Sequence, residues 1–240
     1  MEWFKTWFAS PYYHLLYKSR NDEEAELFIS NLLAKWQPAK DARFLDLACG
    51  AGRHAIYLNK QGYQTVGTDL SAPSIETASQ SANESLDFYV QDMRSLFRID
   101  YFDYTLNLFT SFGYFENEYD NVKTLIAAKR GLRPNGKILI DFMNAHKVKN
   151  NLVAEETKSV DGTAFHIKRS TDNQFIYKNI KFKDKEGLHQ DFTEKVQFLD
   201  LNKFESFAGQ AGLQIKATYG DYNLEAFDIN QSDRLILELC

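Results

Sequence analysis

Two glycines and one aspartate, placed at the ends of two apolar runs, carry the strongest chemical signal in this sequence. Gly50 and Gly52 follow the apolar run 44–48, and glycines allow a tight turn and a close approach of a ligand to the backbone. Asp69 ends a second apolar run about 20 residues further along, where a carboxylate can accept hydrogen bonds from both hydroxyls of a ribose. The three residues together predict a nucleotide-binding turn between two strands.

The charge of the expected ligand follows from Asp46, at the tip of the first strand. The segment 50–55 also fits G-x-G-x-x-A, so a nicotinamide-dependent oxidoreductase stays open as an alternative. However, the carboxylate of Asp46 would repel a pyrophosphate and cancel the anion-binding advantage of the following helix N-terminus. S-adenosylmethionine carries a sulfonium and an ammonium, which a carboxylate attracts. The sequence therefore favours this cofactor over a dinucleotide.

An alternation of expected strands and helices positions these residues. Strands are predicted at 44–48, 63–68, 87–90, 101–109 and 137–141, and helices at 22–36, 53–61, after Pro73 and at 119–132. Such alternation requires right-handed crossovers, and it gives a parallel sheet with helices on both faces. We therefore predict an α/β fold with a doubly wound, Rossmann-like sheet.

The pattern changes after residue 150. The segments 163–169, 175–183 and 188–199 are strand-like with no helix between them, and they predict a small antiparallel insertion. A helix at 201–211 and strands at 213–219 and 234–239 then rejoin the main sheet. The expected division is an N-terminal aromatic and helical cap (1–40), a cofactor-binding core (41–150), the insertion (151–200), which covers an acceptor or forms a dimer contact, and the C-terminal part of the core sheet (201–240).

The cap is dense in aromatic residues. It holds Trp3, Phe4, Trp7, Phe8, Tyr12, Tyr13 and Tyr17. Such rings can form a lid over a cofactor or acceptor, because aromatic faces attract a sulfonium. They can equally pack on a sheet, and the two roles can coexist.

Several motifs in order resemble those of class I S-adenosylmethionine-dependent methyltransferases of the small-molecule type. They are Asp-Leu-Ala-Cys-Gly-Ala-Gly at 46–52, Val-Gln-Asp-Met-Arg at 90–94, the fourth-strand segment 102–109 and the Leu-x-Pro-x-Gly turn at 132–136. The commoner first motif has glycine where Ala48 stands, and Asn135 replaces a glycine of the turn. The resemblance implies a seven-stranded mixed sheet with one antiparallel strand near its end, and an insertion that partly covers the acceptor site.

The resemblance also implies where the cofactor binds. Asp92 is expected to meet the adenine amino group. The full cofactor-binding set that we predict is Asp46, Ala48, Gly50, Gly52, Arg53, Asp69, Leu70, Asp92, Met93 and Phe109.

Methyl transfer from a sulfonium is an in-line displacement that needs mainly alignment and a dry site. No catalytic residue is therefore assigned from the sequence. The side chains expected near the acceptor mouth are Tyr114, Asp141, His146 and Arg234, with His166 and His189 on the inserted strands. A structural or surface role is the favoured interpretation for each of them.

The composition of the chain limits the classes of partner that we expect it to bind. The 240 residues carry a net charge of −5, which gives no global reason to bind nucleic acid or an anionic membrane. The lysines 178, 181, 183 and 185 are interpreted as a solvated strand face, with RNA contact as the alternative.

Cys49 and Cys240 form neither a disulfide framework nor a metal site. No apolar run spans a membrane and no signal-peptide pattern begins the chain.

We therefore expect a cytoplasmic monomer or homodimer that methylates a small molecule and binds neither metal, nucleic acid nor membrane. The segment 110–115 lacks the Pro-Pro-aromatic turn typical of base N-methylating enzymes. A non-catalytic module that binds adenosyl ligands remains a second alternative, beside the oxidoreductase.

Overall fold

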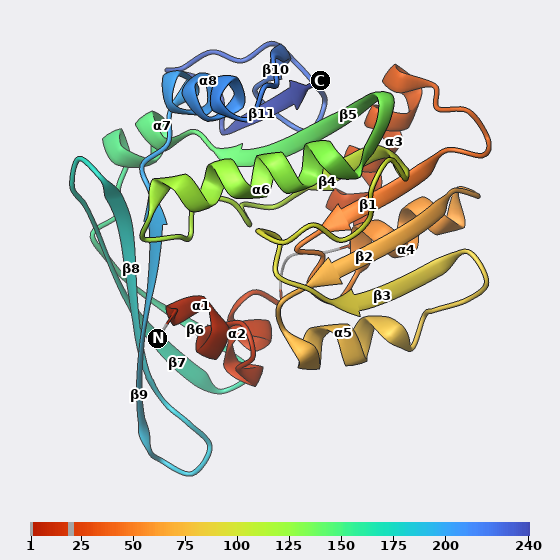
Figure 1. Cartoon of the computed structure of the whole chain (residues 1–240). Coiled ribbons are helices and arrows are strands. Elements are labelled where there is room, and N and C mark those ends of the chain that lie inside the picture. Colours follow the sequence, from red (N-terminus) through yellow and green to blue (C-terminus); the bar gives the residue numbers. More distant parts are fainter. Residues whose placement is uncertain (1, 19–21) are drawn as a thin grey trace.

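The computed structural model describes residues 2–18 and 22–240 of the chain. A seven-stranded sheet with the order β10-β11-β5-β4-β1-β2-β3 forms its centre (Figure 1). Its strands are β1 (Arg43–Leu47), β2 (Gln64–Asp69), β3 (Leu86–Val90), β4 (Phe102–Asn107), β5 (Leu132–Met143), β10 (Ile215–Tyr219) and β11 (Arg234–Leu239). The strand order reverses between β1 and β4, which is where doubly wound sheets open a ligand crevice.

Helices cover both faces of this sheet, as the strand–helix alternation predicts. They are α3 (Asp22–Trp36), α4 (Arg53–Lys60), α5 (Ala72–Ser79), α6 (Glu118–Gly131), α7 (Ala145–Asn150) and α8 (Leu201–Gln210). Successive strand residues point to opposite faces: Phe44 belongs to a buried cluster with residues of α3 and α4, and Leu45 belongs to another with residues of α6 and α8. Both faces of the central strands are therefore buried, which explains their continuous apolar runs.

The last strands close the sheet with reversed direction. β11 pairs antiparallel with both β5 and β10, whereas the pairs among β1 to β5 are parallel. The predicted α/β fold with a seven-stranded mixed sheet is thus confirmed. β5 begins at Leu132 rather than near residue 137, because Leu132 already pairs with Phe102 before the chain turns at Asn135, where φ is +67°.

A second, four-stranded antiparallel sheet follows β5. It consists of β6 (Glu155–Val160), β7 (Thr163–Thr171), β8 (Phe175–Lys183) and β9 (His189–Gln197). The sequence predicted only three of these strands. β6 was missed because it is an edge strand whose polar side chains are mostly exposed, so no apolar alternation marks it.

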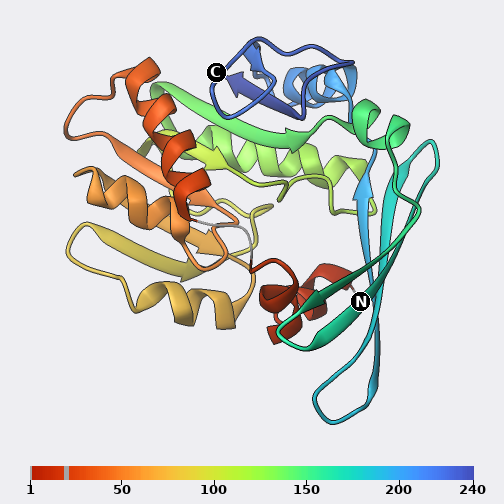
Figure 2. The ribbon, with the colours of Figure 1, turned by 180° about the vertical axis from the view of Figure 1, so that it is seen from behind.

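Two short N-terminal helices lie between the two sheets, as Figure 2 shows. α1 (Trp3–Trp7) and α2 (Pro11–Leu16) are too short to leave a periodic signal, although Ser10 caps α2 through the backbone N–H of Tyr12. Their apolar side chains pack on β7 and β8, where Trp7 and Leu16 join a buried cluster with Phe165 and Ile180. Among the described residues, we find no helix with the length and apolarity needed to cross a bilayer.

The two glycines of the turn between β1 and α4 should respond differently to the same substitution. A Cβ on Gly52, where φ is +83°, would lie 2.6 Å from Cε1 of the buried Phe88 ring, whereas a Cβ on Gly50, where φ is +56°, meets nothing within 4 Å. We expect Gly52→Ala to lower the free energy of unfolding by roughly 2–4 kcal/mol, since overpacking adds to backbone strain. Gly50→Ala should cost about 1–2 kcal/mol from strain alone. Urea denaturation measures both, and equal losses would contradict the assignment.

Candidate functional site

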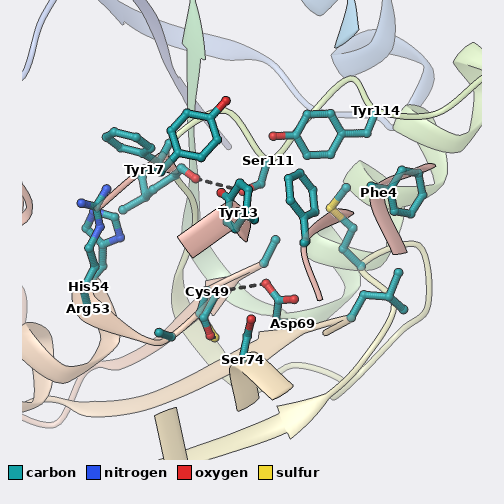
Figure 3. A pocket seen from close by; sticks show the side chains of 18 of the residues that line it. Phe4, Tyr13, Tyr17, Cys49, Arg53, His54, Asp69, Ser74, Ser111 and Tyr114 are labelled. Atoms are coloured by element: carbon teal, nitrogen blue, oxygen red, sulfur yellow. Dashed lines mark hydrogen bonds between the residues drawn. The ribbon is translucent and has the colours of Figure 1, made fainter. Parts of the chain in front are cut away.

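A cavity of about 390 Å³ opens at the carboxyl ends of β1, β2 and β4. Its floor is the turn between β1 and α4 together with the end of β2, and its side wall is the loop that follows β4 (Figure 3). Side chains of α1, α2 and the residues just after α2 form the opposite wall. The cavity therefore combines the crevice expected at the strand-order reversal with a cover from the N-terminus.

Most of the predicted cofactor-binding residues line this cavity. They are Ala48, Gly50, Arg53, Asp69, Leu70, Asp92, Met93 and Phe109. Ala48 adopts φ of +62°, a left-handed conformation that favours glycine. This strain accounts for the glycine that the commoner form of the motif has at this position.

The Asp69 carboxylate connects two backbone segments in the floor of the cavity. Its carboxylate accepts hydrogen bonds from the backbone N–H of Gly50 and of Ser71, both at 2.8 Å and each on a different oxygen. Burial raises the pKa of this carboxyl, and the backbone donors of Ser71 and Gly50 oppose that effect. A carboxylate has about four acceptor positions, and the backbone donors do not occupy all of them. The group can thus accept further hydrogen bonds from a hydroxyl-bearing ligand.

Asp92 lies at another side of the cavity and is tied to a cation. Arg94 donates to both of its oxygens, with the shorter contact at 2.6 Å, and these hydrogen bonds are the main cause of the lowered pKa of Asp92. Arg94 also bridges to Asp120 at 3.0 Å and to Glu2, next to α1, at 2.8 Å. The edge of the cavity at Asp92 is therefore linked electrostatically to the N-terminal cover.

Asp46 and Gly52 do not line the cavity, which corrects the expectation that Asp46 faces the ligand. The Asp46 side chain is only 1% exposed and accepts a hydrogen bond from the backbone N–H of Ala55 at 3.1 Å. Burial raises its pKa to about 7. Asp46 thus supports the first turn of α4, and Gly52 provides the space that the Phe88 ring occupies.

The N-terminal aromatic residues serve as both cover and packing. Phe4, Phe8, Tyr13 and Tyr17 line the cavity. Trp3 and Phe8 contact the ring of Tyr114 on the far side, with ring centroids 5.2 and 5.3 Å apart. Trp7 and Tyr12 instead contact Phe192 and Phe182 of the four-stranded sheet with tilted rings, in both cases with centroids 4.6 Å apart.

Among the side chains expected at the acceptor mouth, Tyr114 lines the cavity, and its hydroxyl donates to the carbonyl of Thr110. Asp141 is fully buried behind the wall, where it accepts from the backbone N–H of Phe109 at 3.0 Å and from Nε of Arg234 at 2.7 Å. Arg234 also donates to Oγ1 of Thr110 at 2.9 Å. Phe109 and Thr110 both have positive φ, so this buried ion pair holds a strained loop in place.

The remaining expected residues lie elsewhere. His146 is beside Asp200 at 3.7 Å, and His166 and His189 are exposed on β7 and β9. Among the residues that the structure describes, none from 155–197 lines the cavity. Lys178 also departs from the predicted solvated face, because its side chain is 16% exposed and its Nζ donates to the Tyr17 hydroxyl at 2.6 Å.

Sequence reasoning missed His14, His54, Ser74, Gln91 and Ser111, which also line the cavity. Burial lowers the pKa of His14, and the charge of Asp69 partly opposes this shift. No local pattern marks His14, since α2 reaches the cavity only through its docking on the distant four-stranded sheet.

Comparison with known proteins agrees with this geometry. Residues 44–136 match the family description "Methyltransferase domain". A Bacillus subtilis (strain 168) protein, YqeM, provisionally named a methyltransferase, is 31% identical over 144 residues, which cover 59% of this chain and 56% of that protein. The glycine/sarcosine N-methyltransferase of Halorhodospira halochloris is 30% identical over 131 residues, covering 52% and 47%. The chain thus spans about half the length of the curated relatives it matches.

The similarity in fold extends over nearly the whole chain. The crystal structure of an S-adenosylmethionine-dependent methyltransferase from Clostridium acetobutylicum ATCC 824 aligns with a TM-score of 0.80 at 20% identity, and it covers 97% of this chain and 96% of that one. The agreement includes the four-stranded sheet that follows β5.

His54 should make the stability of the ligand-free protein sensitive to acid. Burial lowers its pKa to about 3, whereas an unfolded imidazole binds a proton below about pH 6.5. The stabilisation is therefore present above pH 6.5 and is lost as the pH falls, by about 1.4 kcal/mol per pH unit. Relative to His54→Gln, the wild type should lose stability at this rate between pH 6.5 and 4. Urea unfolding at several pH values measures the difference, and parallel curves would contradict it. Asp46 contributes to the pH dependence of the unfolding free energy in both proteins. Its contribution therefore cancels when the wild type is compared with His54→Gln.

Proposed function

We propose that the chain is a class I S-adenosylmethionine-dependent methyltransferase that methylates a small molecule inside the described cavity. The methyltransferase-domain match of residues 44–136 and the similarity in fold support this proposal. S-adenosylmethionine is the cofactor used by methyltransferases of this family. The observation that carries the proposal is one cavity that joins the glycine turn, Asp69 and Asp92 to an aromatic wall.

The residues present suit this cofactor. The open space beside Gly50 admits a ligand against the backbone, and Asp69 has lone pairs for the two ribose hydroxyls. Asp92 is the group proposed to accept from the adenine amino group. The aromatic rings opposite the turn suit a sulfonium through cation–π attraction. The remaining cavity-lining residues of the predicted set, Ala48, Arg53, Leu70, Met93 and Phe109, are proposed to contact the same ligand.

The cofactor supplies the methyl group and its leaving group, and the protein supplies alignment and exclusion of water. The rings of Phe4, Phe8, Tyr13, Tyr17 and Tyr114 give the cavity apolar walls. For an acceptor that must lose a proton, we nominate His14, because burial lowers its pKa and keeps the imidazole neutral near pH 7.

The cover argues for a small acceptor. A polymer would have to displace α1 and α2, which are fastened to the four-stranded sheet by a buried apolar cluster. The relative from Halorhodospira halochloris is named for methylating glycine and sarcosine, which are small amines. Both observations support a small-molecule acceptor over nucleic acid or protein.

The proposal assigns separate tasks to the parts of the chain. Residues 41–150 and 201–240 hold the cofactor, and α1, α2 and residues 151–200 build the cover, while α3 packs on the core sheet. The oligomeric state that we propose is a monomer or a homodimer. The free thiols of Cys49 and Cys240 suit a reducing compartment, and we propose the cytoplasm.

S-adenosylhomocysteine should bind and raise the melting temperature, whereas NAD should not. Asp69→Ala should weaken S-adenosylhomocysteine binding by roughly 1.5–3 kcal/mol, because hydrogen bonds to a charged group are lost. Isothermal titration calorimetry measures the dissociation constant, and Asp87→Ala, at an exposed position of β3, is the matched control. An unchanged dissociation constant in Asp69→Ala would refute the assignment. Stabilisation by NAD instead would favour the oxidoreductase.

Methyl transfer has to be measured separately from ligand binding. Incubation with cofactor labelled in its methyl group and a small-molecule extract should move label into that extract only when the protein is present. Binding without any such transfer would favour the non-catalytic module.

Asp92 should make binding depend on the adenine amino group. The wild type should bind adenosylhomocysteine at least about tenfold more tightly than its inosyl analogue, since the Asp92 carboxylate would lose a donor. In Asp92→Ala this preference should vanish. Asp120→Asn disturbs the same Arg94 network but keeps the Asp92 carboxylate, so its preference should persist. Equal binding of the two ligands by the wild type would show that Asp92 does not read the adenine edge.

A further inference from the structure

The four-stranded sheet reaches the cavity indirectly, through the N-terminal cover and through the loop after β4, where Nε2 of Gln197 on β9 donates to the carbonyl of Phe115 at 2.8 Å. No residue of 155–197 lines the cavity within the described part of the chain, yet α1 and α2 lie directly against this sheet (Figure 2). One side of the α1–α2 segment packs on the sheet through Trp7 and Leu16. The other side presents Phe4, Phe8 and Tyr17 to the cavity. The α1–α2 segment is therefore a route by which the sheet can influence a bound ligand.

A polar clamp within this apolar contact fixes the position of the cover. Glu194 on β9 accepts from Nε1 of Trp7 at 2.7 Å and from the Tyr17 hydroxyl at 2.7 and 2.9 Å. Nζ of Lys178 on β8 donates to the same hydroxyl at 2.6 Å and lies 4.0 Å from the Glu194 carboxylate. Both charged side chains are largely buried, at 14% and 16% exposure.

The hydrogen bonds of this clamp are directional, whereas the apolar packing around them is not. Packing of Trp7 and Leu16 on the sheet is non-directional and tolerates sliding of the helices. Hydrogen bonds to an ionised carboxylate are short, strong and geometrically specific. Because Glu194 holds one donor on α1 and one just after α2, it sets the segment at both ends. Tyr17 in particular spans the wall, with its ring at the cavity and its hydroxyl on the clamp.

We propose that Glu194 is a positioning residue that keeps the α1–α2 cover closed over the bound cofactor by fixing Tyr17 and Trp7. The inference rests on the proposed function, since it assumes that the cavity holds an adenosyl ligand. It assigns the four-stranded sheet a role in ligand retention that it performs without touching the ligand. Glu194 acts through Tyr17, and the two residues should therefore behave as one energetic unit.

A double-mutant cycle on Glu194→Ala and Tyr17→Phe tests this coupling, with the affinity and dissociation rate of S-adenosylhomocysteine as readouts. Glu194→Ala should weaken binding roughly tenfold, mainly through faster dissociation, because an unfastened cover opens more often. Tyr17→Phe keeps the ring and loses only the hydroxyl. The double variant should bind no more weakly than the weaker single variant, since the second change removes a contact that is already lost.

Asp191→Ala is the matched control on the same strand. Asp191 pairs with Lys181 at 3.2 Å on the exposed part of the sheet, so its removal should leave affinity and dissociation rate unchanged. Glu194→Gln retains one acceptor oxygen, so its affinity and dissociation rate should lie between those of the wild type and of Glu194→Ala. It replaces Glu194→Ala in the double-mutant cycle if the alanine variant does not fold. Additive losses, or an unchanged dissociation rate in Glu194→Ala, would overturn the proposal. A wild type that fails to bind S-adenosylhomocysteine would instead overturn the proposed function.

Discussion

A single buried carboxylate joins the two turns on which the site depends. Asp69 ends β2 and receives backbone N–H groups from Gly50, after β1, and from Ser71, before α5. The parallel pairing of β1 with β2 brings these segments together, and the N–H of Cys49 extends that pairing to the carbonyl of Thr68 at 2.9 Å. Without an acceptor at this point, the N–H of Gly50 would lose its partner in a turn whose residues Ala48, Gly50 and Gly52 all have positive φ.

A second constraint comes from the buried pair Asp141 and Arg234, which hold the wall rather than the mouth of the cavity. Burying two charges is costly unless each is fully satisfied, and here the carboxylate accepts from Arg234, from the N–H of Phe109 and from the Tyr222 hydroxyl. Since β11 pairs antiparallel with β5, the arginine and the aspartate arise on neighbouring strands. The reversed strand thus does more than close the sheet, because it supplies the cation that stabilises the loop after β4.

The cover over the cavity is fastened from two directions. Glu2 reaches Arg94 and, through it, Asp92 at the edge of the cavity. Glu194 holds the other side to the four-stranded sheet. The N-terminal segment therefore depends on contacts with both sheets. This arrangement connects the four-stranded sheet to the cavity although none of its described residues from 155–197 lines it.

The sequence by itself determined the parallel core strands and the glycine turn after β1, because these depend on local rules. Apolar runs that end at glycine or aspartate mark buried parallel strands, and they placed Gly50 and Asp69 at one edge of the sheet. The resemblance of the ordered motifs to a known family implied the seven strands and the position of Asp92. Only the tertiary structure decided where charged side chains point. Asp46 turned inward to the start of α4, and Lys178 became part of a buried clamp. It also brought His14 and Tyr17 to the cavity, since short helices have no stability or periodic signal of their own and acquire their position only from the distant surfaces on which they pack.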